Sequence, residues 1–387
     1  MLVRLRNRRK TGREHRVSKH LLLVAGSGRS GTSLFASVVG NLGFHVPRPW
    51  VKADDSNPRG FGEPQWVVDR HTEYLRQANV HASDARPTAW ADTAKLCLDE
   101  QVSTEVRLWL EEQFSGHERV LIKDPRLLWF LPLWRRVGEE LDANVHVVTM
   151  LRHPAEVVRS KLHWYHNMTL FDANRAAGWL NTMLFTERAT RDHRRAYVRF
   201  EDLLEDWTQP IARVSAQLEV PSLVNARARE QLSADSIVDN SLHRSKATWE
   251  DLDVPKGLIY LIERVWEDLL SLADPEADGD EAVLARLDAY REEYVSFYRH
   301  AEHVAQSTTL AATRPLLQKK SPRSVAAKPS AAARLATARP NQPVSPPSAQ
   351  PEPAPNSRWG LARRLIPARA RNLIPLRVKR ALAELFG

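Results

Sequence analysis

Short apolar runs alternate along the chain with longer segments in which apolar positions recur at helical spacing. The runs that predict strands cover residues 21–25, 120–123, 145–151 and 196–200. Helical patterns fill the intervals, notably around 101–114, 154–166 and 173–192, and an acidic helical segment at 256–300 predicts a cap. Alternation of this kind favours right-handed β-α-β units, a parallel sheet and ligands at the carboxyl ends of its strands.

A glycine loop follows the first predicted strand. It holds Gly26, Gly28 and Gly31 and precedes a helix-period segment, an arrangement in which backbone N–H groups and the helix N-terminus can hold an anion. The spacing almost matches the nucleotide-binding pattern G-x-x-x-x-G-K-[ST], but Thr32 stands in place of the lysine. Without that lysine the loop lacks the usual cation for the β and γ phosphates. The loop therefore predicts an anion other than a nucleoside triphosphate, with Arg29 as the nearby cation.

The segment Arg29-Ser30-Gly31-Thr32-Ser33 resembles the 5′-phosphosulfate loop of sulfotransferases, whose common form is Lys-Ser-Gly-Thr-Thr. These enzymes take a sulfuryl group from 3′-phosphoadenosine 5′-phosphosulfate (PAPS) and have a P-loop-like α/β fold. The resemblance implies that Arg29 faces the transferring sulfuryl group. It also implies that the loop from Gly28 to Ser33, with Ser30, Gly31 and Thr32, surrounds the 5′-phosphate.

A second segment strengthens the resemblance. Arg152 follows the predicted strand at 145–151, and Ser160 lies eight residues later on a predicted helix that begins near Pro154. Sulfotransferases hold the 3′-phosphate of the donor with an Arg and a Ser at this spacing, as in R-x-P-x-x-x-x-x-S. An Arg offers a bidentate fork to a phosphate dianion, so the chemistry fits these residue types. Arg244, in a basic stretch that departs from the familiar Arg-Lys-Gly form, is a weaker candidate for the same phosphate.

Two further segments carry candidate catalytic residues. Lys123-Asp124-Pro125-Arg126 ends a predicted strand and is similar to an active-site element of bacterial sulfotransferases. In it, Lys123 or Arg126 could neutralise charge on the transferring group, although an internal salt-bridge cluster is the alternative. Glu63 lies in the loop 57–64, which is similar to a segment near the acceptor site of bacterial members. Glu63 is the first candidate for the base that removes the acceptor proton, and His71 and Asp124 are the alternatives.

Charge divides the chain into a body and two tails. The net charge of +9 combines +7 in residues 1–19, +13 in residues 305–387 and −11 in the body at 20–304. Residues 305–357 are rich in Ala, Pro and Ser and predict a disordered linker. Residues 358–387 form a basic amphipathic tail that suits an anionic membrane surface, with weak polyanion binding as the equal alternative. No apolar run is long enough to span a bilayer, and we expect a cytoplasmic protein, in part peripheral at the inner membrane surface.

These observations together predict a three-layer, P-loop-like α/β fold with a central parallel sheet, a helical cap and a disordered basic C-terminal tail. The expected function is PAPS-dependent transfer of a sulfuryl group to a hydroxyl, with a carbohydrate or glycolipid favoured as acceptor. No metal and no specific nucleic acid are expected. A small-molecule kinase of the P-loop type and a non-catalytic protein that binds polyanions or membranes are the alternatives.

Overall fold

The computed structural model describes residues 18–57, 60–164, 170–225, 237–238 and 246–320. The chain divides into two units, residues 1–318 and 319–387. Arg244, residues 1–17 and residues 321–387 lie outside the described part, so the phosphate contact, the basic extension, most of the linker and the membrane tail stay predictions. None of the described helices is long and apolar enough to cross a membrane.

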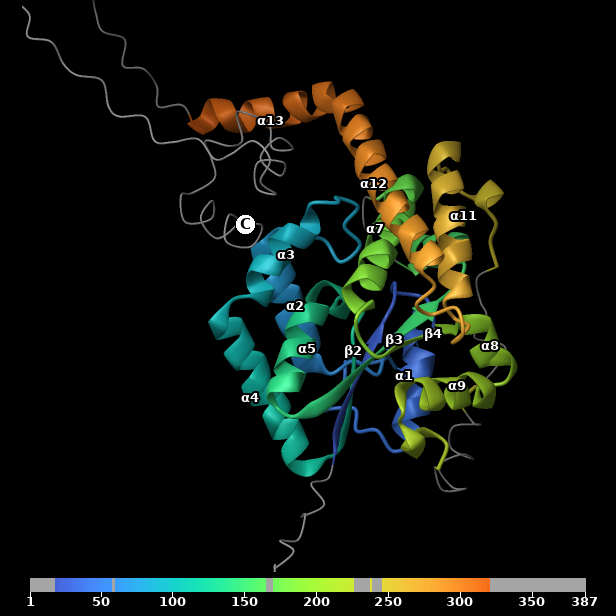
Figure 1. The fold of residues 1–387 in the computed structure, drawn as a ribbon. Coiled ribbons are helices and arrows are strands. Elements are labelled where there is room, and N and C mark those ends of the chain that lie inside the picture. The colour runs from blue at the N-terminus through green and yellow to red at the C-terminus, as the bar shows by residue number, and fades with distance from the viewer. Residues whose placement is uncertain (1–17, 58–59, 165–169, 226–236, 239–245, 321–387) are drawn as a thin grey trace, which may run out of the picture. The chain divides into compact units, whose positions relative to one another are not determined.

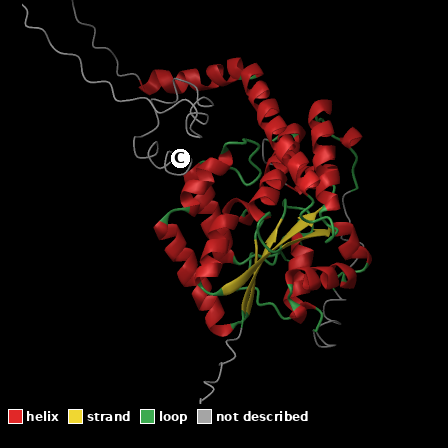
Figure 2. Cartoon of the chain, viewed as in Figure 1, coloured by secondary structure: helices red, strands yellow, loops and turns green. Residues whose placement is uncertain are grey.

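Among the described residues, four parallel strands form the central sheet in the order β2-β1-β3-β4. Figure 2 shows this sheet in yellow among the helices. The strands are β1 (Lys19–Ala25), β2 (Arg119–Lys123), β3 (Ala143–Leu151) and β4 (Arg195–Arg199). All four predicted strands are confirmed. The central strand β1 pairs with both neighbours, and Leu23 lies opposite Ile122 on one side and Val147 on the other. Because all the pairings are parallel, the four carboxyl ends lie along one edge of the sheet.

Helices cover both faces of the sheet, as a buried parallel sheet requires (Figure 1). Side chains of β1 alternate between the faces: Leu21 and Leu23 belong to one core cluster, Leu22 and Val24 to another. The first cluster is completed by α2 (Gln65–Ala78), α3 (Ala89–Cys97), α4 (Glu100–Gly116) and α5 (Leu131–Glu140). The second is completed by α1 (Thr32–Asn41), α8 (Phe200–Glu205) and α9 (Thr208–Leu218). The three layers confirm the predicted fold class.

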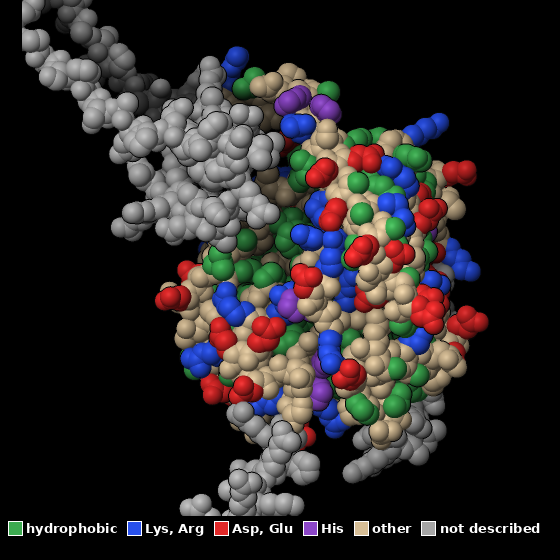
Figure 3. All heavy atoms as spheres, in the orientation of Figure 1, with side chains coloured by type: hydrophobic (Ala, Val, Ile, Leu, Met, Phe, Trp, Pro, Cys, Tyr) green, Lys and Arg blue, Asp and Glu red, His purple; other side chains and the backbone are tan. Residues whose placement is uncertain are grey.

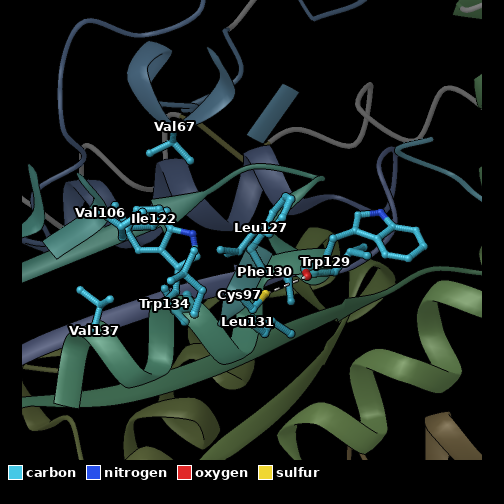
Figure 4. Packing of buried hydrophobic residues seen from close by; sticks show 14 of the residues in the cluster. Val67, Cys97, Val106, Ile122, Leu127, Trp129, Phe130, Leu131, Trp134 and Val137 are labelled. Atoms are coloured by element: carbon cyan, nitrogen blue, oxygen red, sulfur yellow. Dashed lines mark hydrogen bonds between the residues drawn. The ribbon is translucent and has the colours of Figure 1, made fainter. Parts of the chain in front are cut away.

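The first core cluster fixes the segment that follows β2. Figure 4 shows Trp129, Phe130 and Trp134 packed with aliphatic side chains from the neighbouring elements. Residues Leu127–Phe130 form a single 3-10 turn, and the Leu127 amide donates to the carbonyl of Asp124. Large buried aromatic side chains contribute strongly to core stability. Their packing therefore holds the carboxyl end of β2, with Lys123 and Asp124, in a defined place.

Further described helices build a third cluster around α7. These are α6 (Pro154–Trp164), α7 (Asp172–Thr190), α11 (Lys256–Ser271) and α12 (Glu281–Val304). Tyr294 of α12 donates its hydroxyl to the carbonyl oxygens of Ala85 and Ala177, at 2.5 and 3.2 Å. The helices expected at 256–300 are thus present and packed on the body.

The segment after residue 304 differs from the expectation. A further helix, α13 (Gln306–Lys320), occupies the start of the region predicted as a disordered linker. The described side chains of α13 are almost all exposed, so burial does not account for this helix. Its Leu, Ala, Gln and Lys residues favour helix, whereas its three Thr residues and Pro315 do not.

Candidate active site

All four strands end at one cavity of about 640 Å³, a size typical of small-molecule sites. Residues that follow β1, β2, β3 and β4 line it, as the rule for parallel sheets predicts. Its cationic lining consists mainly of Arg29, Lys123, Arg126, Arg152, Lys161 and Arg175. The acidic lining is limited to Asp54 and Glu63 among the described residues. The cavity is therefore suited to anionic ligands.

The glycine loop needs its glycines because its backbone is in the left-handed region at two of them. Gly26 has φ +128° and Gly31 has φ +88°. A Cβ at Gly31 would lie 2.3 Å from Cδ2 of Phe200, and one at Gly26 would lie 2.8 Å from the Met150 carbonyl oxygen. Arg29 is also left-handed, with φ +78°. Such a conformation in a residue that carries a side chain is uncommon and clusters at functional sites.

Arg29 connects the two predicted donor-binding segments. Its Nε donates to the Ser160 hydroxyl at 3.1 Å, and both terminal nitrogens lie 3.3 Å from the carbonyl oxygen of Ser56. Arg152 donates from Nη1 to the carbonyl of Arg29 at 3.1 Å and from Nε to Glu156 at 2.9 Å. Its guanidinium lies 4.7 Å from the centre of the Phe200 ring. The loop after β1 and the segment after β3 are thus joined by direct contacts.

Lys123 is the cation at the end of β2. Its Nζ donates to the Ser33 hydroxyl at 3.0 Å, to the Phe61 carbonyl at 3.2 Å and to Oε1 of Glu63 at 2.5 Å. Both charged side chains of this pair are buried. Burial raises the pKa of the Glu63 carboxyl above its ordinary value, although Lys123 opposes that change. The arrangement places an ammonium group and a carboxylate side by side in the cavity wall.

The side chains of the two alternative bases, His71 and Asp124, contact each other. Nδ1 of His71 lies 2.6 Å from Oδ2 of Asp124, and its Nε2 accepts a hydrogen bond from the Trp134 indole at 2.8 Å. Because an indole nitrogen can only donate, Nε2 is unprotonated and Nδ1 donates to the carboxylate. Burial alone would raise the pKa of Asp124, but Arg126 and His71 outweigh it and hold that pKa below its usual range. Neither side chain lines the cavity, and we infer that both position Arg126 there.

A lysine that the sequence reasoning missed also reaches the cavity. Lys161 of α6 is 5% exposed, and its Nζ donates to the hydroxyls of Ser27 and Ser83 at 2.9 and 3.0 Å. It shares the buried face of α6 with Val157 and Val158. A lysine three and four residues after such apolar positions breaks the amphipathic pattern, and that departure is the signal that could have found it.

Most of the predicted site residues meet at this cavity. Its lining includes Gly28, Arg29, Gly31, Thr32, Ser33, Glu63, Lys123 and Arg152. Two others do not line it: Ser30 donates its hydroxyl to the Ser27 carbonyl at 2.5 Å, and Ser160 accepts from Nε of Arg29 at 3.1 Å. Their contacts with the donor stay predictions. Arg244 lies outside the described residues.

The chain resembles known proteins only among solved structures. No protein-family model matches the chain, and no curated protein is similar to it in sequence. Solved structures that it resembles include the sulfotransferase domain of the Synechococcus PCC 7002 olefin synthase, at 18% identity over 65% of this chain and 95% of that one, with a TM-score of 0.39. Sulfotransferase STF1 from Mycobacterium tuberculosis gives 14% identity, 57% and 71% coverage and a TM-score of 0.37. The sulfotransferase domain from the curacin biosynthetic pathway gives 17% identity, 63% and 96% coverage and a TM-score of 0.37.

Proposed function

We propose that the chain is a sulfotransferase, which moves a sulfuryl group from PAPS to a hydroxyl of an acceptor bound in this cavity. The observation that carries the proposal is the 3.0 Å contact between Lys123 Nζ and the Ser33 hydroxyl. In nucleotide-binding loops of the Walker type, the hydroxyl at this position binds Mg²⁺. Here an ammonium group takes that place, and Thr32 replaces the loop lysine. This combination favours a metal-independent transfer over the small-molecule kinase alternative.

The cations of the cavity fit a donor with two anionic ends. Arg152 would hold the 3′-phosphate, since its planar fork suits a phosphate dianion. The backbone from Gly28 to Ser33 and the N-terminus of α1 would hold the 5′-phosphate. Arg29, fixed by Ser160 and Ser56, would face the sulfuryl group. Hydrogen bonds from Arg29 to Ser160 and from Arg152 to the Arg29 carbonyl join these groups to one another.

The donor supplies the sulfuryl group: its sulfur–oxygen bond to the 5′-phosphate breaks, a bond to the acceptor oxygen forms, and 3′-phosphoadenosine 5′-phosphate leaves. Glu63 takes the proton of the acceptor hydroxyl, and the raised pKa of its carboxyl makes it a stronger base. Lys123, at 2.5 Å from Glu63, neutralises charge that develops beside it. Arg29, on the glycine loop, also neutralises charge that develops on the transferring group.

The acceptor is the less defined partner. A carbohydrate or glycolipid remains the proposal, and the apolar side of the cavity supports an acceptor with an apolar portion. That side is formed by Val68 and Leu75 of α2 together with Val80 and Leu128. Delivery of a lipid-linked acceptor by the basic tail at an anionic membrane surface is part of the same proposal.

Binding of 3′-phosphoadenosine 5′-phosphate, the spent donor, tests the assignment. Titration calorimetry should show that it binds the wild type and that Arg152→Ala weakens binding about ten- to a hundredfold, because hydrogen bonds to charged groups contribute about 1.5–3 kcal/mol. Arg188→Ala is the matched control, since Arg188 is 57% exposed on α7 and does not line the cavity. Absence of product binding, or tighter binding of ATP with Mg²⁺, would contradict the proposal.

A further inference from the structure

Lys161 occupies a part of the cavity to which the donor assignment gives no role. Two of the three ammonium protons point to the hydroxyls of Ser27 and Ser83, and the third has no partner among the described residues. Each of those hydroxyls accepts from the lysine, so its own proton remains available to donate. The cavity lining thus holds an ammonium group and two hydroxyls within hydrogen-bond distance of it, and donors of these kinds match the oxygens of an anion.

The charge around Lys161 points to the same ligand. Burial lowers the pKa of its ammonium group to about 8, and the positive charge of Arg175 adds to that effect. No carboxylate contacts Lys161 among the described residues, and Arg175 lies against it by donating to its carbonyl oxygen at 3.4 Å. A buried charge without a counter-charge is costly. An anionic group of the ligand would supply the counter-charge that the Lys161 ammonium group lacks.

Lys161 contacts the glycine loop at Ser27, next to Gly28, and also reaches a segment outside that loop. Lys123, Arg29 and Arg152 already match the anionic parts of PAPS. Lys161 instead bridges the start of the loop, at Ser27, to Ser83 on the segment between α2 and α3. That segment also supplies Val80 and Ala82 to the apolar side of the cavity, which we assign to the acceptor.

We propose that Lys161, Ser27 and Ser83, with Arg175 beside them, form a subsite for an acidic group of the acceptor. The substrate class is then a hydroxyl compound that also carries a carboxylate, phosphate or sulfate. This inference rests on the proposed sulfotransferase function and adds the part of the substrate that sets its specificity. The apolar side of the cavity and this subsite together select an amphipathic acid.

The test measures binding to the full chain saturated with 3′-phosphoadenosine 5′-phosphate. The probes are matched pairs: 12-hydroxydodecanoate beside 12-hydroxydodecanamide, and dodecyl phosphate beside dodecanol. Calorimetry should show that each acid binds about ten- to a hundredfold more tightly than its neutral partner. Lys161→Met should abolish that preference, Lys161→Arg should restore part of it, and product affinity should stay unchanged in both variants. Turnover of the hydroxy acid against its amide provides a second readout.

Protein stability distinguishes a binding role from a structural one. Lys161→Met removes a buried cation that lacks a carboxylate partner, so without ligand it should be at least as stable as the wild type. A clear loss of stability, no acid preference in the wild type, or equal losses for acid and neutral probes would overturn the subsite. Loss of product affinity in Lys161→Met would assign the lysine to the donor instead. If the wild type binds no product, the proposed function fails, and the acceptor subsite fails with it.

Discussion

The contact between Gly31 and Phe200 gives the sharpest prediction for the glycine loop. Gly31 has φ +88°, and a Cβ there would lie 2.3 Å from Cδ2 of Phe200. A left-handed conformation costs a non-glycine residue about 1–2 kcal/mol, and overpacking adds about 1–3 kcal/mol. Gly31→Ala should therefore lower the free energy of unfolding by about 2–5 kcal/mol. That is a large share of the about 5–15 kcal/mol that stabilises a typical native protein.

The same substitution should also disturb the proposed donor site. The Phe200 ring lies 4.7 Å from the guanidinium carbon of Arg152, so a methyl group that displaces the ring also displaces the guanidinium. We expect Gly31→Ala to weaken binding of 3′-phosphoadenosine 5′-phosphate as well as the fold. Binding measured well below the unfolding transition separates this effect from the loss of stability.

Urea denaturation with two glycine controls tests the magnitude. Gly60 and Gly279 have φ +85° and +100°, and a Cβ at either would meet no atom within 4 Å. Gly60→Ala and Gly279→Ala should therefore show the backbone cost alone, about 1–2 kcal/mol. The excess loss in Gly31→Ala measures the collision with Phe200. Equal losses in all three variants would refute the steric reasoning.

Three further predictions concern individual ionisable groups. Glu63→Gln should lower turnover about 10²–10⁴-fold with product affinity unchanged, and near-normal turnover would move proton removal to another group. Burial raises the pKa of the Cys97 thiol to about 11, so a disulfide reagent at pH 8 should label it only after unfolding, and rapid labelling of the native protein would contradict this. Burial, His20 and Arg194 lower the pKa of His146 from 6.5 to about 4. The unfolded chain therefore takes up a proton at higher pH than the native state, and the free energy of unfolding should fall as the pH drops through that interval. His146→Gln should flatten this slope, and an unchanged slope would show that other groups cause it.

The sequence alone determined the sheet and the edge at which the site lies. Apolar runs at 21–25 and 145–151 became β1 and β3, because a fully buried parallel strand needs a continuous apolar segment that contiguous residues provide. Gly31 and Arg152, which line the cavity, were predicted in the same way, since a glycine loop and an arginine after a strand are local features. At α13 the structure has a helix where the composition of a longer region predicted a disordered linker.

The tertiary structure decided which side chains line the cavity and which partners they have. The hydroxyl of Ser160 accepts from Arg29, 131 residues away in the chain, and its contact with the phosphate stays a prediction. The ring of His71 accepts a hydrogen bond from Trp134, 63 residues away, and its role as a base stays a prediction. Lys161 lines the cavity, where its Nζ donates to the hydroxyl of Ser27, 134 residues away in the chain. A side chain's partners depend on the packing of distant elements, and hydrogen-bond geometry allows errors of only a few tenths of an ångström, which no local pattern in the sequence encodes.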